Sequence, residues 1–93
     1  MTIGVLHVNF LIEGARSLKD RRRVVKDFKD QIRSRFNCAI AETAYQDLRQ
    51  RARLTAVVVS NESKHANSQL TGIGRFIETR VGASIVDYQI EML

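Results

Sequence analysis

The chain has 93 residues, enough for one hydrophobic core but not for two, so we expect a single domain over residues 1–93. Lys and Arg number 15 against 10 Asp and Glu, a formal charge of +5, and the hydrophobic share of 44% is too high for a disordered chain. One cysteine excludes an internal disulfide and any four-cysteine metal site. No segment approaches the roughly 20 apolar residues that span a bilayer, and no basic stretch precedes the first apolar run. We therefore expect a cytoplasmic protein with no membrane partner.

The first two predicted elements are a strand and a long helix. Residues 3–12 alternate with period two, which predicts a strand. Its inner face would carry Leu6, Val8, Phe10 and Ile12. Ser17 is a typical helix N-cap, with Asp20 at the capping-box position, and Asn37 can end the helix. Between them an apolar stripe recurs at helical spacing, formed by Leu18, Val25, Phe28, Ile32 and Phe36.

The next four predicted elements are two strands, a second helix and a last strand, so that each half of the chain is a strand–helix–strand unit. Residues 38–45 predict a strand with Cys38 and Ile40 pointing inward, and residues 51–60 predict a strand so apolar that we expect it to be central and buried on both faces. Asn61 would cap a second helix. The apolar stripe of that helix would be Ala66, Leu70, Ile73, Ile77 and Val81. A last strand alternates, with Val86, Tyr88, Ile90 and Met92 on one face.

The order strand, helix, strand, strand, helix, strand predicts an α+β fold of the ferredoxin-like βαββαβ kind. In this sandwich a four-stranded antiparallel sheet carries both helices on one face. The other face is open, and we expect it to expose Val5 and Leu11 among polar groups.

The positive charge is concentrated on the first helix and its approach. Residues 15–36 hold nine Lys and Arg against three Asp, a net charge of +6, whereas the rest of the chain has six basic and seven acidic residues, a net charge of −1. Five of the cations step by 3, 4, 3 and 4 residues and so form a single ridge, Lys19, Arg22, Lys26, Lys29 and Arg33. Like charges at this spacing destabilise a helix by about 0.2–0.5 kcal/mol per pair, so the ridge favours an anionic partner.

The cations at the start of the helix also favour an anionic partner. Arg21, Arg22 and Arg23 lie in its first turns, where the helix dipole disfavours cations unless an anion shares the site. In the predicted sandwich the loop between the second and third strands lies at the same end, so Arg49, Arg51 and Arg53 would widen the patch. The predicted nucleic-acid-binding residues are Lys19, Arg21, Arg22, Arg23, Lys26, Lys29, Arg33, Arg49 and Arg51. The alternative is a solvated helix face that aids solubility.

Other residues that could carry chemistry have structural explanations. Cys38 at an inward strand position is typical of a small buried hydrophobe. His7 and His65 fall on different elements without companion metal ligands. Glu42, Gln46 and Asp47 either form a general acid/base pair or, as we favour, bond to the backbone of a turn. We expect no catalytic residue, no cofactor and no metal.

Several segments together resemble a known family. They are Ile3–Leu6, Ala15–Lys26, Arg35–Asn37, Ala41–Glu42, Gln46–Leu48, Gln50–Ala52 and Val59–Glu62. The chain is similar over nearly its whole length to the bacterial YlxP-like family, a domain family of unknown function. The resemblance implies a ferredoxin-like fold and, because the family's genes often lie beside those for translation initiation and ribosome-maturation factors, a role linked to translation. Relatives often have Pro where this chain has Gly14, Trp where it has Arg49 and Asp where it has Glu62.

Three functions compete at this point. The first, which we favour, is binding of RNA or the ribosome through the basic helix. The second is a homo-oligomeric structural or interaction module that pairs through its open face or an edge strand, with Val5, Leu11 and Ile85 as contacts. The third is an enzyme acting on a phosphorylated or acyl-phosphate substrate held at the arginine-rich helix start. We expect the protein not to be an enzyme, because no base or nucleophile accompanies those arginines.

Overall fold

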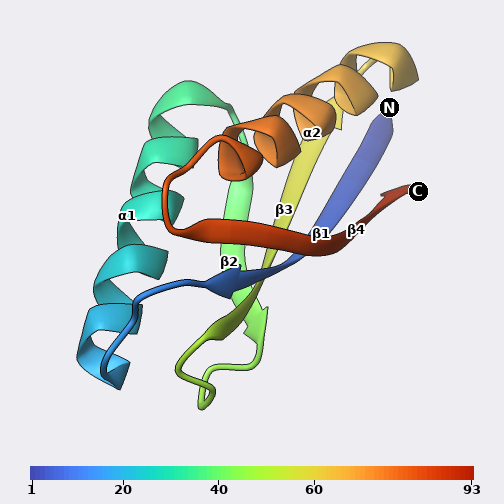
Figure 1. Ribbon diagram of the computed structural model, residues 1–93. Helices are drawn as coiled ribbons and strands as arrows, with labels where there is room; N and C mark the ends of the chain where they lie inside the picture. Colours follow the sequence, from blue (N-terminus) through green and yellow to red (C-terminus); the bar gives the residue numbers. More distant parts are fainter.

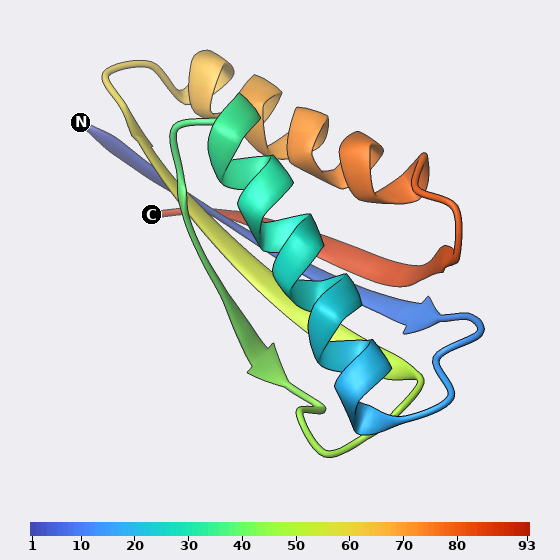
Figure 2. The same cartoon turned by 90° about the vertical axis from the view of Figure 1, so that its left-hand side faces the viewer.

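All 93 residues are described by a computed structural model, and they form six elements in the predicted order. The bounds are β1 (Thr2–Ile12), α1 (Leu18–Arg35), β2 (Ala39–Ala44), β3 (Arg51–Ser60), α2 (Ser63–Glu78) and β4 (Ala83–Met92). The strands pair antiparallel in the order β2-β3-β1-β4, and both helices lie on the same side of the sheet (Figures 1 and 2). The ferredoxin-like fold is confirmed. Neither helix has the length and apolar character that crossing a membrane requires.

The core lies between the sheet and the helices. Alternate residues of β1 and β3 are buried, and they face a buried stripe on each helix. The core strand residues are Leu6, Val8, Phe10, Ile12, Ala52, Leu54, Ala56 and Val58. The strand β3 is central, as predicted, but the expectation that it is buried on both faces is wrong. Val57 is half-buried and Val59 is 65% exposed, because no element covers the second face of the sheet.

A side chain caps the N-terminus of only one of the two helices. The Asp20 backbone N–H donates to Ser17 Oγ at 3.1 Å, which confirms the N-cap of α1, while the Asp20 carboxylate accepts from the Arg16 N–H at 3.3 Å. For α2 the predicted cap is wrong, since Glu62 and not Asn61 occupies the cap position and makes no side-chain capping bond. Val81 lies beyond the end of this helix and is fully exposed, so it is not part of the apolar stripe.

The edge strand β4 departs from the predicted alternation at one point. The register with β1 shifts between Asn9, which pairs with Asp87, and Phe10, which pairs with Ile85, so Val86 is an extra residue between the two pairs. As a result Ile85 packs against the core and is not the open-face contact that the sequence suggested.

Candidate nucleic-acid interface

The five cations at helical spacing form one ridge along α1, here called the basic ridge (Lys19, Arg22, Lys26, Lys29 and Arg33). The helix turns Val25, Phe28 and Ile32 into the core, and this leaves the ridge on the side of α1 that faces the edge strand β2. A shallow groove of about 370 Å³ runs there. It is lined by Arg22, Val25, Lys26, Lys29, Asp30, Arg33 and Glu42. Four of the ridge residues are exposed and Lys29 is half-buried.

Two ridge residues are paired within the molecule. Lys26 Nζ lies 2.7 Å from Asp30 Oδ2, and Arg33 Nη1 lies 3.6 Å from Asp30 Oδ1. The hydrogen bond with Asp30 raises the pKa of Lys26, and the same bond lowers the pKa of Asp30. The pair is fully exposed, so solvent and salt screen it and it competes weakly with a polyanion.

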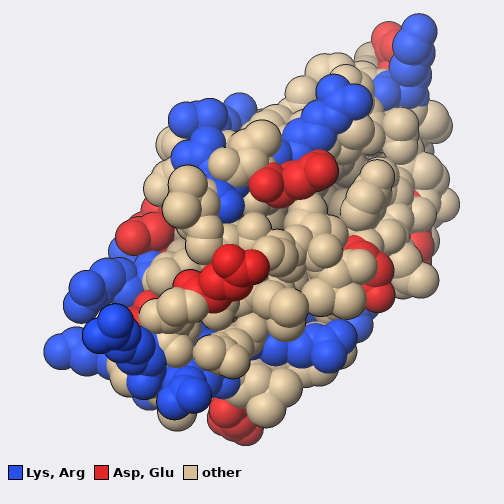
Figure 3. All heavy atoms as spheres, viewed as in Figure 1, with Lys and Arg blue, Asp and Glu red and all other residues tan.

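Five other cations of α1 form no ion pair with any carboxylate of the chain. Arg35, at the end of the helix, stacks over the Phe76 ring at 4.9 Å. The other four are Lys19, Arg22, Arg23 and Lys29, here called the free cations. In Figure 3 the Lys and Arg atoms gather at the lower left, over the first turns of α1 and the β2–β3 connection. The charge segregation seen in the sequence is therefore retained on the folded surface.

Arg21 is a correction to the predicted site. Its side chain is 2% exposed, so no docking partner can reach it. The guanidinium donates to both carboxylate oxygens of Glu42, with Nη1 to Oε1 at 3.2 Å, and Glu42 is itself largely buried. Arg21 also donates to three backbone carbonyls, those of Tyr45 (2.7 Å) and Leu48 (2.5 Å) in the β2–β3 connection and that of Arg51 (3.0 Å) at the start of β3.

The sequence contained a signal for this burial. Arg21, Val25, Phe28 and Ile32 step by 4, 3 and 4 residues, so Arg21 continues the apolar stripe and not the basic ridge. The Glu42 carboxylate on the neighbouring strand compensates the buried charge. The Glu42 carboxylate is thus engaged in an ion pair and does not bond to the backbone of the turn. The Gln46 side chain does so, since its Nε2 donates to the Glu42 carbonyl at 3.4 Å.

The connection between β2 and β3 lies against the first turns of α1, as predicted. Arg21 donates to two carbonyls of the connection and to the first carbonyl of β3, and Tyr45 takes a left-handed backbone conformation (φ 66°). The Arg51 guanidinium stacks over the Tyr45 ring at 4.6 Å. Arg49 is exposed and forms no ion pair, and Arg53 lies on β3 opposite Asn9 of β1.

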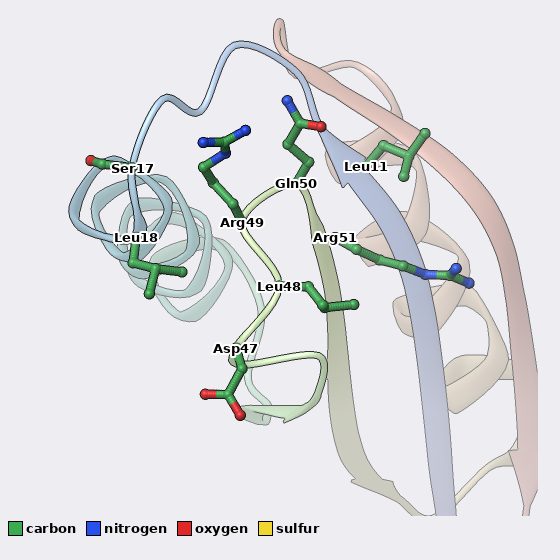
Figure 4. Close-up of a pocket in the computed structure, with 8 residues that line it drawn as sticks. All are labelled: Leu11, Ser17, Leu18, Asp47, Leu48, Arg49, Gln50 and Arg51. Carbon is green, nitrogen blue, oxygen red and sulfur yellow. The ribbon is translucent and has the colours of Figure 1, made fainter.

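A second groove lies between this connection, the start of α1 and the end of β1, and we call it the terminal groove (Figure 4). Its volume is about 580 Å³. It is lined by Leu11, Ser17, Leu18, Asp47, Leu48, Arg49, Gln50 and Arg51. Leu18, which the apolar stripe predicts to lie in the core, is exposed at this groove. Leu48, for which the sequence suggests no role, is exposed there as well. The sequence contained a signal for both residues, since Leu18 is apolar at the exposed first position of a helix and Leu48 is apolar within a polar turn.

The remaining candidates are not brought together. Cys38 is half-buried beside the core, and this burial raises the pKa of its thiol. His7 Nδ1 lies 2.9 Å from Thr55 Oγ1 on the open sheet face, and His65 is exposed at the start of α2. No three side chains among His, Cys, Asp and Glu gather in a way that could hold a metal ion.

Comparisons with known proteins give a family and a weak structural likeness. A curated relative, "Uncharacterized protein YlxP" of Bacillus subtilis (strain 168), is 31% identical over 77 residues, which are 83% of this chain and 84% of the relative. Among solved structures, the de novo designed protein Ferredog-Diesel has a TM-score of 0.46 at 11% identity over 98% of this chain and 84% of its own. A second designed protein with a ferredoxin fold has a TM-score of 0.43 at 15% identity over 100% and 83%.

The fold assignment rests on the strand order and pairing described above and not on these structural likenesses. The family assignment rests on sequence. The model of the family described as "Protein of unknown function (DUF503)" matches residues 3–90, which is nearly the entire chain. This protein therefore belongs to the YlxP-like family of unknown function, DUF503.

Proposed function

We propose that this protein binds RNA, and ribosomal RNA in particular, through the free cations of α1 and the groove beside them. The observation that carries the proposal is that Lys19, Arg22, Arg23 and Lys29 stay exposed or half-buried on one helix without any carboxylate partner. Cations held close together repel one another, and phosphates placed between them remove that repulsion.

The dimensions of the ridge suit a nucleic-acid backbone. From Lys19 to Arg33 the helix advances 14 residues, which is about 21 Å at 1.5 Å per residue. Neighbouring ridge residues lie about 5–6 Å apart, so several phosphates can be neutralised in sequence along one strand. Contacts of this kind position a protein on RNA by shape and charge, and they read no base sequence.

The test is binding to a ribosomal RNA fragment by mobility shift over a salt series, with two charge-matched double variants. Arg22→Glu with Lys29→Glu removes two free cations, while Lys64→Glu with Arg75→Glu makes the same change in net charge on the exposed side of α2. We expect the α1 variant to lose at least tenfold in affinity and the α2 variant to stay within about twofold. Equal losses, or no binding by the wild type at low salt, would overturn the proposal.

Self-association is a second candidate function, and the edge strand β4 favours it. This strand is ten residues long, and it contains neither lysine nor proline to discourage pairing. Three of its large apolar side chains are exposed, namely Val86, Tyr88 and Met92. A second copy pairing along β4 would cover them. Sedimentation should then show a dimer that Tyr88→Lys dissociates, and a monomer at high micromolar concentration would exclude this candidate.

We further propose a binding protein of the cytoplasm and not an enzyme. The buried Arg21–Glu42 pair is used to hold the β2–β3 connection, so the Glu42 carboxylate beside the arginine-rich helix start is already engaged. Turnover of an acyl phosphate that Arg22→Ala abolishes would contradict this part of the proposal.

A further inference from the structure

The terminal groove has an apolar lining that no element of the chain covers. Leu11 (41% exposed), Leu18 (43%) and Leu48 (50%) reach it from β1, from α1 and from the β2–β3 connection. Three large apolar side chains from separate elements, gathered in one hollow, are typical of a surface that another molecule covers.

The backbone around the groove is held in place before any partner arrives. Arg21 donates to the carbonyls of Tyr45 and Leu48, at the start and in the middle of the connection, and to that of Arg51, the first residue of β3. The Leu48 N–H adds a turn bond to the Tyr45 carbonyl at 3.0 Å. A partner therefore meets a formed groove, with little ordering entropy left to lose.

The rim of the groove is positively charged and continuous with the ridge. Arg49 and Arg51 supply the charge, and the ridge begins at Lys19, the residue after Leu18 in the first turn of α1. Asp47 is the single acidic residue of the lining, and Gln50 offers an amide that can both donate and accept. A ligand that fits needs a flat apolar body, a polar edge and a nearby negative charge.

We propose that the terminal groove receives an unpaired nucleotide of the RNA that the basic ridge binds. A nucleobase has two apolar faces that can lie on the leucines, and its polar edge can meet the Gln50 amide. Its phosphate would be close to Arg49 and Lys19. This inference rests on the proposed function, and it names the substrate as RNA with a bulge or loop and not as a continuous duplex.

The experiment compares two RNA stems that differ in one nucleotide. One stem is fully paired, and the other carries a single bulged 2-aminopurine, whose fluorescence changes when it leaves the stack. We expect wild-type protein to bind the bulged stem about fivefold to tenfold more tightly and to change the fluorescence of the 2-aminopurine. This gain is at the low end of that for a base stacked on an aromatic side chain, because leucines offer apolar contact without a ring.

Two double variants distinguish the contribution of the terminal groove to binding from that of the basic ridge. Leu18→Ser with Leu48→Ser should abolish the preference for the bulge and the fluorescence change while leaving binding to the paired stem intact. Val59→Ser with Val81→Ser, at exposed apolar positions outside the groove, is the matched control and should change neither.

Each failure has a distinct meaning. Equal binding of both stems by the wild type, at normal salt-dependent affinity, overturns the nucleotide site and leaves the RNA-binding proposal standing. A bulge preference that survives the leucine variants also overturns it, because the base then binds elsewhere. Failure to bind either stem at low salt overturns both proposals.

Discussion

At the scale of single residues, Arg21 and Arg22 have different surroundings although they belong to one basic run. Arg21 and Arg22 are neighbours in sequence, yet Arg21 is buried in a network of five acceptor contacts and Arg22 is exposed without an ion pair. A residue that organises the β2–β3 connection from inside can affect binding only through the shape of that connection. Arg21 therefore positions the connection, whereas Arg22 is the one of the two that the proposed RNA site uses as a contact.

The first prediction concerns this contrast. Arg21→Met leaves the Glu42 carboxylate buried without its partner, and breaking a buried pair in this way costs about 3–5 kcal/mol in the free energy of unfolding. Arg22→Met at the exposed neighbouring position should change that free energy by less than about 0.5 kcal/mol. Urea denaturation followed by circular dichroism measures both.

A second substitution tests the assignment to the ion pair. Adding Glu42→Leu to Arg21→Met removes the orphaned charge and should restore a large part of the lost stability. Equal stability of the Arg21→Met and Arg22→Met proteins would show that the pair contributes nothing.

The second prediction concerns Cys38. Burial raises the pKa of its thiol, and the positive charge of Arg33 opposes this effect. The thiolate is the reactive form, so at pH 8 labelling with a disulfide reagent should be slower in the folded protein than in urea. Because the folded pKa is the higher one, the contribution of Cys38 to stability is present below the unfolded pKa of 9.0 and is lost as pH rises through the folded value.

Arg33→Gln provides the control for this prediction. Removing the positive charge should raise the pKa of the Cys38 thiol further, so labelling of the folded variant should be slower than labelling of the folded wild type. Labelling that is as fast in the folded protein as in urea would contradict the burial of the thiol.

At the scale of elements, two glycines of α2 occupy different surroundings. A Cβ added at Gly72 would lie 3.0 Å from Phe36 Cε1, so this glycine permits the close approach of the two helices. A Cβ added at Gly74 would meet nothing within 4 Å. The glycine at position 74 only weakens the helix, since it leaves the backbone freer in the unfolded chain.

The third prediction follows from that difference. Gly74→Ala should stabilise the protein by about 0.5–1 kcal/mol, the usual gain in a helix interior. Gly72→Ala should gain less or nothing, because the Phe36 ring has to move. Thermal unfolding of the two variants compares them directly, and equal stabilisation would show that Gly72 has no packing role.

Helices and strands could be predicted from the sequence wherever the periodic spacing of apolar residues was uninterrupted. All six elements and the cap at Ser17 could be predicted, because alternation and helical spacing report which side of an element faces the core. The predictions failed where a long-range partner decides the outcome. The extra residue at Val86 depends on pairing with β1, and the cap of α2 depends on how the chain leaves β3.

At the scale of the whole molecule, the same reasoning explains what could be predicted of the site. The concentration of charge on α1 is a property of composition, and it could be read directly. The Lys26–Asp30 pair could also be predicted, because the two residues are four apart on one helix. The pairing of Arg21 could not, because it depends on Glu42, which the fold brings near from another element. The terminal groove could not be predicted, because its leucines come from three elements that only the fold assembles.

The last prediction concerns this whole-molecule charge. If the four free cations each neutralise one RNA phosphate, the logarithm of the affinity should fall with the logarithm of the salt concentration with a slope of about −3, at 0.7–0.9 per phosphate. Each single substitution of a free cation by Gln should make the slope shallower by about 0.7–0.9 and weaken binding to different RNAs alike. Lys26→Gln should change the slope less, because Asp30 already neutralises part of that charge. A salt titration of fluorescence anisotropy measures these slopes, and a slope near zero, or one unchanged by Arg22→Gln, would show that the basic ridge is a solvated face.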